Sequence, residues 1–172
     1  MVIKRILLLS LLAIAFISHS FAQRYAVIDS RYILEKLPDY KAAQTKLNQF
    51  SEQWQKEIDK KGDTLDKLRK NYEAEQVMLS DDLKKKREDE IFNKEKELTD
   101  LQKKRFGYEG DLFKKRKELI KPVQDKVYNA IQRLASEKLY DFILDKSEGI
   151  TVIFADPKLD RSDDVLRILG VK

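Results

Sequence analysis

Residues 40–72, YKAAQTKLNQFSEQWQKEIDKKGDTLDKLRKNY, decide the fold of this chain. Apolar residues recur there at spacings of three and four, which places them on one stripe of a long helix, and a second such series follows. The two series are Tyr40, Ala43, Leu47, Phe50, Trp54, Ile58, Leu65, Leu68 and Tyr72, then Ile91, Leu98, Leu101, Tyr108, Leu112 and Leu119. Each stripe needs a partner helix to bury it. The two series therefore predict a long antiparallel helical hairpin that projects as an arm.

The ends of this arm follow from residues that stop or cap helices. We expect the outgoing helix over residues 39–78 and the returning helix over residues 82–119, with Ser80 at the tip. Pro38 breaks the preceding helix and redirects the chain into the arm. Pro122 lies inside a continuing helical pattern, so we expect it to kink or restart the helix where the arm joins the body.

A tip at this position fixes which residues of the two helices face each other. Their numbers sum to about 160, so Trp54 faces Phe106. By the same register, Phe50 lies near Gly110. Gly107 and Gly110 are costly inside a helix, and two interpretations explain them. They either make room for the aromatic rings on the facing helix or mark a hinge or kink.

Strand patterns flank the arm on both sides. Residues 25–29, 139–144 and 150–155 are rich in β-branched and aromatic residues, and the last two are separated by a turn that predicts a hairpin. A short helix capped by Asp29 or Ser30 follows the first strand. A final short helix, capped by Ser162, is expected over residues 162–169.

These elements predict an α+β, mainly helical protein in which a long antiparallel coiled-coil hairpin is inserted into a small β-strand body. The body takes residues 23–38 and 122–172, and the arm takes residues 39–121. So few strands and short helices make a poor independent core. Open sheet edges also invite pairing with other chains. We therefore expect association with copies of the same chain in a closed, symmetric oligomer.

Residues 1–22 have the pattern of a cleaved signal peptide. Lys4 and Arg5 form a charged start, residues 6–17 form a short apolar run, and Ser20 and Ala22 place small residues before a cleavage site. The run is shorter than the ~20 residues that a membrane-spanning helix needs. We therefore expect cleavage before Gln23 and export of the mature chain.

Composition excludes most common active sites. The chain has no cysteine, and its one histidine, His19, lies in the predicted signal peptide. The mature chain therefore lacks the residues for Ser-His-Asp and Cys-His catalysis and for ordinary zinc sites. Its acidic residues alternate with lysines along helices, as in solvated ion pairs. We expect no enzymatic activity, no cofactor and no metal site, and the mild net charge of +5 argues against nucleic-acid binding.

The order of these segments resembles the Skp/OmpH family of periplasmic chaperones over essentially the entire mature chain. IDSRYILEKLPDYKAAQ begins at Ile28 and precedes the charged hairpin, and KPVQDKVYNAIQRLASEKLYDFILD follows it from Lys121. ITVIFADP and SDDVLRILG complete the order. The resemblance implies a homotrimer whose strands form a central β-barrel and whose hairpins hang as three tentacles around a cavity. It also implies that unfolded outer-membrane proteins are held in this cavity without ATP.

A second seven-residue repeat on the returning helix is the candidate client-binding surface. It falls one position after the seam residues, about 100° around the helix, where a two-helix seam leaves it partly exposed. It either touches unfolded clients or packs against the body and thickens the arm core. The residues are Phe92, Phe106 and Phe113, with Thr99 and Ile120 in the same repeat.

A run of basic residues lies at the arm tip. It either attracts acidic clients, an anionic membrane or lipopolysaccharide, or is a solvated helix face. The run is Lys84, Lys85, Lys86 and Arg87.

We therefore predict an ATP-independent holdase chaperone for unfolded outer-membrane proteins, with arms that flex near Gly107, Gly110 and Pro122. The alternative is a structural coiled-coil spacer or adaptor of the cell envelope. Lipid or lipopolysaccharide binding is a third interpretation.

Overall fold

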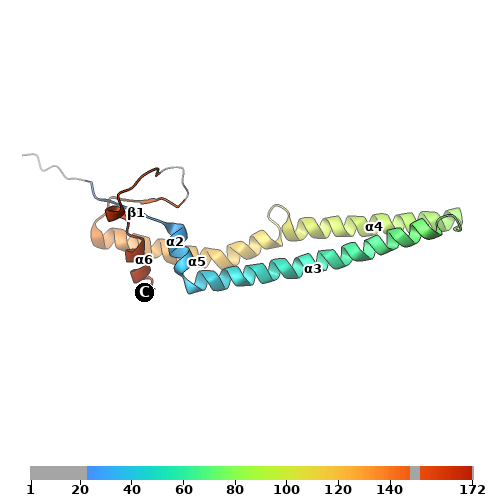
Figure 1. The fold of residues 1–172 in the computed structure, drawn as a ribbon, viewed down its shortest axis with the longest axis horizontal. Helices are drawn as coiled ribbons and strands as arrows, with labels where there is room; N and C mark the ends of the chain where they lie inside the picture. Colours follow the sequence, from blue (N-terminus) through green and yellow to red (C-terminus); the bar gives the residue numbers. More distant parts are fainter. Residues whose placement is uncertain (1–22, 148–151, 172) are drawn as a thin grey trace, which may run out of the picture.

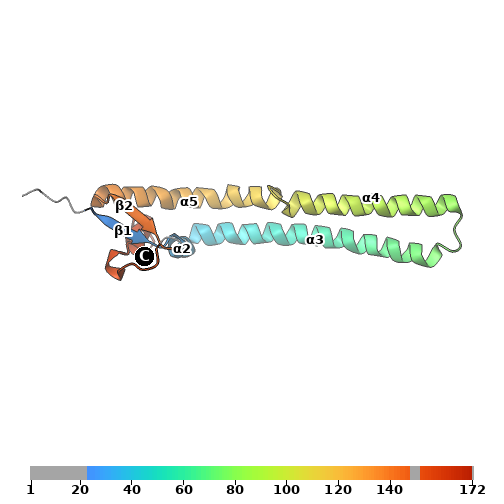
Figure 2. The ribbon, with the colours of Figure 1, turned by 90° about the horizontal axis from the view of Figure 1, so that it is seen from above.

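An arm of paired helices extends from a small body in the computed structural model, which describes residues 23–147 and 152–171 (Figure 1). Helix α3 (Pro38–Glu75) leads outward, and α4 (Asp81–Phe106) and α5 (Asp111–Lys138) return beside it (Figure 2). With 38 residues at ~1.5 Å each, α3 spans about 57 Å. None of the helices in the described residues combines the length and apolar character that crossing a membrane requires.

The predicted stripe of α3 forms the seam of the arm. Its buried residues are Ala43, Leu47, Trp54, Ile58 and Leu65. Helix α5 contributes the facing residues near the body, among them Ile120 and Val123, which are buried. Helix α4 has no buried residue, and its seam positions Ile91, Leu98 and Leu101 are only half-buried. The arm is therefore tightly packed near the body and partly solvated toward the tip.

The tip lies where the sequence predicts it. Ser80 occupies the N-cap position of α4 with an extended backbone, although its side chain makes no capping hydrogen bond. Helix α3 ends at Glu75, three residues before the predicted end at Met78. Asp81 and Asp82 in the first turn of α4 suit the positive end of the helix dipole.

The returning arm is two helices, and the prediction of one continuous helix over residues 82–119 is wrong. Residues 107–110 form a turn, here called the glycine turn, in which Glu109 has a φ of 53°. A Cβ on Gly107 would lie 2.3 Å from the Lys103 carbonyl oxygen, and one on Gly110 would lie 2.8 Å from that of Lys104. The crowding comes from the turn's own backbone. The glycines therefore interrupt the helix and do not make room for rings of α3.

The glycine turn also shifts the register of the arm. On its tip side, three cross-arm pairs have residue numbers that sum to 158, 160 and 164, scattered around the predicted 160; they are Lys61–Glu97, Tyr72–Glu88 and Arg69–Glu95. On its body side, the Lys115 ammonium lies 5.3 Å from the Phe50 ring centre, and these numbers sum to 165. The predicted contact between Phe50 and Gly110 is therefore wrong. A shift of about this size is what four residues looped out of the seam produce.

The body contains a two-stranded parallel sheet of β1 (Tyr25–Ile28) and β2 (Phe142–Asp145), with Tyr25 opposite Phe142. The predicted first strand is confirmed. Strand β2 starts later than predicted because α5 continues to Lys138 and ends with Leu139 in a left-handed conformation. The predicted hairpin is wrong: β2 pairs with β1, and residues 152–155 form no strand. Residues 148–151 of that prediction lie outside the described residues, as does the signal peptide.

Two short helices pack together with α5 and residues of this sheet in the body core. They are α2 (Ser30–Lys36), capped by the Asp29 side chain as predicted, and α6 (Ser162–Ile168), with a 3₁₀ turn at Pro157–Leu159 between β2 and α6. The Ser162 hydroxyl does not cap α6 but accepts a hydrogen bond from the Asp29 backbone N–H at 2.8 Å. The body core consists of Ile28, Ile33, Leu37, Val123, Val127, Ala130, Leu134, Val165 and Leu166.

Helix α5 joins the arm to this core without interruption. It passes through Pro122, so the predicted restart of the helix at this proline does not occur. Ile120 and Val123 on either side of Pro122 are both buried. One helix therefore carries both the seam at the base of the arm and a large part of the body core.

Candidate functional site

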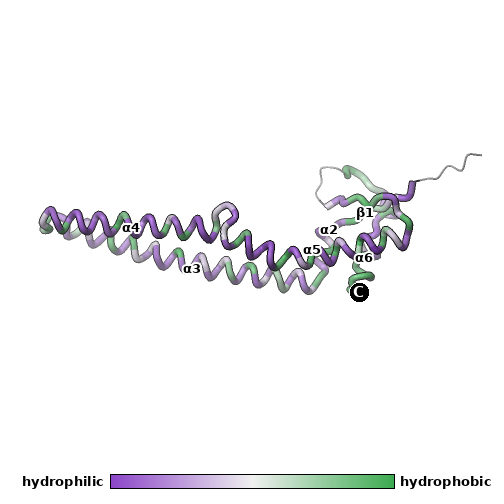
Figure 3. Tube along the Cα trace, turned by 180° about the vertical axis from the view of Figure 1, so that it is seen from behind, coloured by the Kyte–Doolittle hydropathy of each residue, from purple (hydrophilic) through white to green (hydrophobic). Residues whose placement is uncertain are grey.

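The phenylalanines of the second repeat lie on the surface of the arm. Phe92 is 65% exposed, Phe113 is 54% exposed and Phe106 is 37% exposed. Ile120, the next member of the repeat, is buried near the body. The members of the repeat therefore have different environments. Ile120 is part of the packed core near the body, whereas the three phenylalanines face solvent. Figure 3 shows that α4 is mainly hydrophilic along its length.

The arm tip adds apolar side chains that the sequence analysis overlooked. Val77 is 88% exposed and Met78 is 82% exposed, and Leu83 at the start of α4 is also exposed. They lie in or beside the turn between α3 and α4, where burial against a partner helix ends. Three apolar residues in a row at positions 77–79, next to the predicted tip, are the sequence signal that marks them.

The predicted basic run follows this apolar tip directly, and half of its charge is paired. Arg87 binds Glu90 at 2.9 Å, and Lys84 lies 3.9 Å from Asp81. The two lysines between them, Lys85 and Lys86, are exposed and make no ion pair with a described residue. An apolar end with a basic border is a common arrangement for contact with an anionic surface.

Arg105 organises the glycine turn and was not identified from the sequence as a site residue. Its Nη1 donates to Asp111 at 2.6 Å and its Nη2 donates to Glu57 at 3.0 Å. Its guanidinium also lies 5.0 Å from the centre of the Trp54 ring, within cation–π distance. The hydrogen bond to Asp111 raises the pKa of Arg105 above its ordinary value. Arg105 thus joins the end of α4, the start of α5 and the middle of α3.

Tyr108 lies at the crest of the same turn. Its place in the apolar series predicts that it is buried in the seam, but its side chain is almost fully exposed. The prediction is wrong because the four residues of the turn leave the seam, and Tyr108 leaves with them. Pro122, the third predicted hinge residue, lies in the first half of α5, inside a continuous helix.

The described residues offer no separate chemical site on the arm. Among them, no three His, Cys, Asp or Glu side chains are close enough together to hold a metal ion. The features that stand out are instead exposed aromatic groups on a charged helical arm, an apolar tip and a turn at mid-arm. These features suit the binding of another macromolecule through a large surface.

A solved structure shares this architecture. The crystal structure of an OmpH-like protein from Caulobacter crescentus, to which an outer membrane chaperone role is assigned, superposes with a TM-score of 0.69. The superposed region covers 90% of this chain and 87% of the Caulobacter crescentus chain, and the two sequences are 17% identical. At this identity the likeness establishes the fold: a small body with a long helical hairpin.

The sequence comparisons identify the family. Residues 24–169 match the family described as outer membrane protein (OmpH-like), so the chain belongs to the OmpH-like family. An uncharacterized protein from Aquifex aeolicus is 31% identical over 150 residues, which are 87% of this chain and 88% of that protein.

Proposed function

We propose that this protein is an ATP-independent periplasmic holdase that binds unfolded outer-membrane proteins between its arms and prevents their aggregation. The observation that carries the proposal is the exposure of Phe92 and Phe113 on an arm whose surface is mainly charged. Isolated aromatic groups on a polar surface give an unfolded chain separated apolar contacts. The charged side chains between them keep the arm itself soluble.

Weak contacts repeated along the arm suit a client that must later leave. Full burial of one phenylalanine side chain is worth ~1.5–3 kcal/mol, and partial contact is worth less. Several such contacts retain an unfolded chain without fixing its conformation. Because the protein binds the unfolded client and not the folded one, the client leaves when folding into the membrane becomes more favourable than being held.

A homotrimer completes this proposal. Phe142 and Leu144 of β2 are exposed, and so are Ile153 and Phe154 beyond it. A two-stranded parallel sheet with uncovered apolar residues is marginal alone, since parallel sheets are normally covered on both faces. Closing the strands of three protomers into a central β-barrel covers these residues and directs three arms around one cavity.

In the proposed function, the arm tip contacts the surface where the client is delivered, and the glycine turn lets the arm bend. Val77 and Met78, bordered by Lys85 and Lys86, suit contact with an anionic membrane or lipopolysaccharide surface where the client is delivered. A Val77→Ser, Met78→Ser variant tests this, and unchanged sedimentation with phosphatidylglycerol vesicles would contradict it. Flexing at the glycine turn when the Arg105 ion pairs open, and flexing near Pro122, let the arms adapt to clients of different size.

A structural spacer of the cell envelope is the second candidate. The closely packed seam near the body and the two ion pairs of Arg105 favour it, because a spacer must be stiff. A spacer needs no affinity for unfolded chains, whereas a holdase requires it.

The two functions are separated by diluting a urea-unfolded outer-membrane β-barrel protein into buffer with purified residues 23–172. Turbidity reports aggregation, and light scattering gives the mass of the protein alone and with client. The holdase account predicts a trimeric mass and suppressed aggregation at about three chains per client. A well-folded oligomer that leaves aggregation unchanged would support the spacer.

A further inference from the structure

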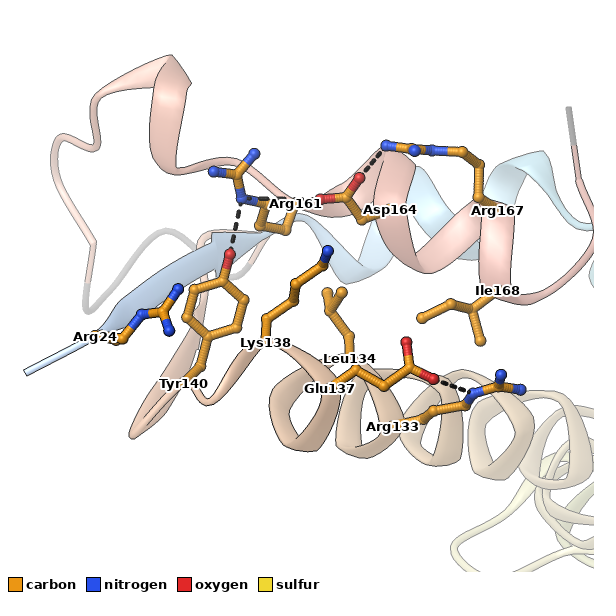
Figure 4. A pocket seen from close by; sticks show the side chains of 10 residues that line it. All are labelled: Arg24, Arg133, Leu134, Glu137, Lys138, Tyr140, Arg161, Asp164, Arg167 and Ile168. Atoms are coloured by element: carbon orange, nitrogen blue, oxygen red, sulfur yellow. Dashed lines mark hydrogen bonds and ion pairs between the residues drawn. The ribbon is translucent and has the colours of Figure 1, made fainter.

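A hollow in the body, away from the arm, carries an unusual concentration of positive charge. It has a volume of about 770 Å³ and opens between the C-terminal end of α5, the start of β1 and helix α6 (Figure 4). Of its ten lining residues, five are arginine or lysine and two are acidic. We call it the basic hollow. None of the arm features described above includes it.

The two acidic residues of the basic hollow are already engaged. Glu137 accepts from Arg133 Nε at 2.7 Å, and Asp164 is ion-paired with Arg167. Within the described residues, Arg24 and Lys138 make no ion pair, and Arg161 reaches Asp164 only at 3.8 Å. Three cationic groups therefore share one hollow with little neutralisation from the protein.

Tyr140 holds two of these cations in place. Its hydroxyl accepts a hydrogen bond from Arg161 Nε at 3.0 Å, which leaves the two terminal nitrogen atoms of that guanidinium free of bonds to described residues. The guanidinium of Arg24 lies 5.9 Å from the centre of the same ring, within cation–π distance. Figure 4 shows both groups beside the ring, with Lys138 reaching from α5 toward the same space. Arg24 and Arg161 are thus positioned before any ligand arrives.

We infer that the basic hollow binds a phosphate group through Arg24, Lys138 and Arg161. Guanidinium groups match phosphate oxygens in paired hydrogen bonds, and a lysine ammonium adds a third charge. Leu134 and Ile168 give the hollow an apolar wall, which suits a phosphate ester more than free phosphate. The phosphate belongs either to a soluble phosphorylated compound or to an anionic lipid headgroup, since both present the same chemistry.

The test uses the oligomer of residues 23–172 and inorganic pyrophosphate as the probe. Calorimetric titration at constant ionic strength is expected to show binding that weakens about tenfold in Arg24→Gln and in Lys138→Gln. These side chains are exposed, so their loss leaves the fold intact. Arg161→Lys keeps the charge but loses the hydrogen bond to Tyr140, and an intermediate affinity is expected. Lys121→Gln is the matched control: it removes one positive charge from the same helix, where Lys121 pairs with Asp125 outside the hollow.

Vesicle sedimentation distinguishes the two phosphate sources, and every protein in this test also carries Val77→Ser and Met78→Ser so that the arm tip does not contribute to vesicle binding. Binding of phosphatidylglycerol but not phosphatidylcholine vesicles that is lost in Lys138→Gln supports a lipid headgroup, and pyrophosphate binding alone supports a soluble ligand. The inference is overturned if millimolar pyrophosphate does not bind, or if Lys121→Gln weakens binding as much as Lys138→Gln. It is also overturned if the hollow variants change only the oligomer mass, because the hollow is then a contact between copies.

Discussion

Arg105 and Asp111 form an ion pair of 2.6 Å that joins the two helices of the returning arm across the glycine turn. The same guanidinium binds Glu57 on the outgoing helix, so one side chain holds three helices together. Its Nε is buried and lacks a hydrogen-bond partner among the described residues. The arm is therefore fastened at the point where its backbone is interrupted.

Arg105→Ala should loosen this point. The substitution leaves Glu57 and Asp111 without their shared partner, and one hydrogen bond to a charged group contributes ~1.5 kcal/mol or more. Amide hydrogen exchange over residues 100–116 should accelerate about tenfold, while the body core exchanges as before. Arg69→Ala, which removes an exposed ion pair with Glu95, should have a much smaller effect. Equal effects of the two variants would contradict a special role for Arg105.

Gly62 and Gly107 should respond oppositely to alanine. Gly62 lies inside α3, and a Cβ there meets no atom within 4 Å, so Gly62→Ala should raise the free energy of unfolding by ~1 kcal/mol. Gly107→Ala places a Cβ against the Lys103 carbonyl and should lower it. Urea denaturation monitored by circular dichroism measures both. Stabilisation by Gly107→Ala would mean that the glycine turn is not required.

Low pH should lower the free energy of unfolding of the body, because Asp160 becomes protonated. Burial raises the pKa of this carboxyl, but hydrogen bonds from Lys146 and Ser162 outweigh burial and hold the pKa below its ordinary value. The resulting stabilisation is complete above the ordinary pKa of ~3.9 and disappears as the pH falls through the lower folded value. Asp160→Asn should therefore lower the free energy of unfolding by ~1 kcal/mol at pH 7 and by much less near pH 2.

Urea denaturation of the wild type, Asp160→Asn and Asp63→Asn at several pH values checks this prediction. Asp63 is exposed on the arm, and its substitution should have little effect at any pH. A difference between Asp160→Asn and the wild type that stays constant down to pH 2 would show that the charge of Asp160 is not its source.

Removing the exposed aromatics should separate activity from stability. The double substitution Phe92→Ser, Phe113→Ser changes surface positions and should alter the free energy of unfolding by less than ~1 kcal/mol. Suppression of client aggregation should nevertheless fall several-fold. Phe50→Ser is the matched control, because Phe50 stacks on Trp54 in the seam at a centroid distance of 5.6 Å and its loss should cost stability. If the double variant still suppressed client aggregation fully, Phe92 and Phe113 would not be part of the binding surface.

The sequence predicts the arm well because its information is local. The stripe from Ala43 to Leu65 needs only helical periodicity, and the tip needs only the polar residues around Ser80. The sequence does not predict that the helix is interrupted at the glycine turn, because Tyr108 follows Leu101 by seven residues and so continues the apolar series across the turn. A repeat counted along the sequence does not reveal that four residues have left the seam.

The body was harder to predict because its contacts are distant in sequence. Turn residues after Asp145 favour a local hairpin, yet β2 pairs with Tyr25–Ile28 at the other end of the chain. The basic hollow could not be predicted for the same reason, because Arg24, Lys138 and Arg161 are distant in sequence and come together only in the folded chain. The exposure of Phe92 follows from its phase on the helix, whereas Arg105 occupies a seam phase where an apolar residue is expected.

Site-specific photo-crosslinking tests the central claim, that the arm holds unfolded clients through its exposed phenylalanines. Phe92 and Phe113 are each replaced by p-benzoylphenylalanine in purified residues 23–172, and a urea-unfolded outer-membrane β-barrel protein is diluted into this protein under illumination. Lys94, about 200° around the helix from Phe92, carries the same probe as the control. We predict strong crosslinks from positions 92 and 113 and weak ones from position 94. Equal labelling at all three positions, or none at 92 and 113 while aggregation is suppressed, would contradict the account.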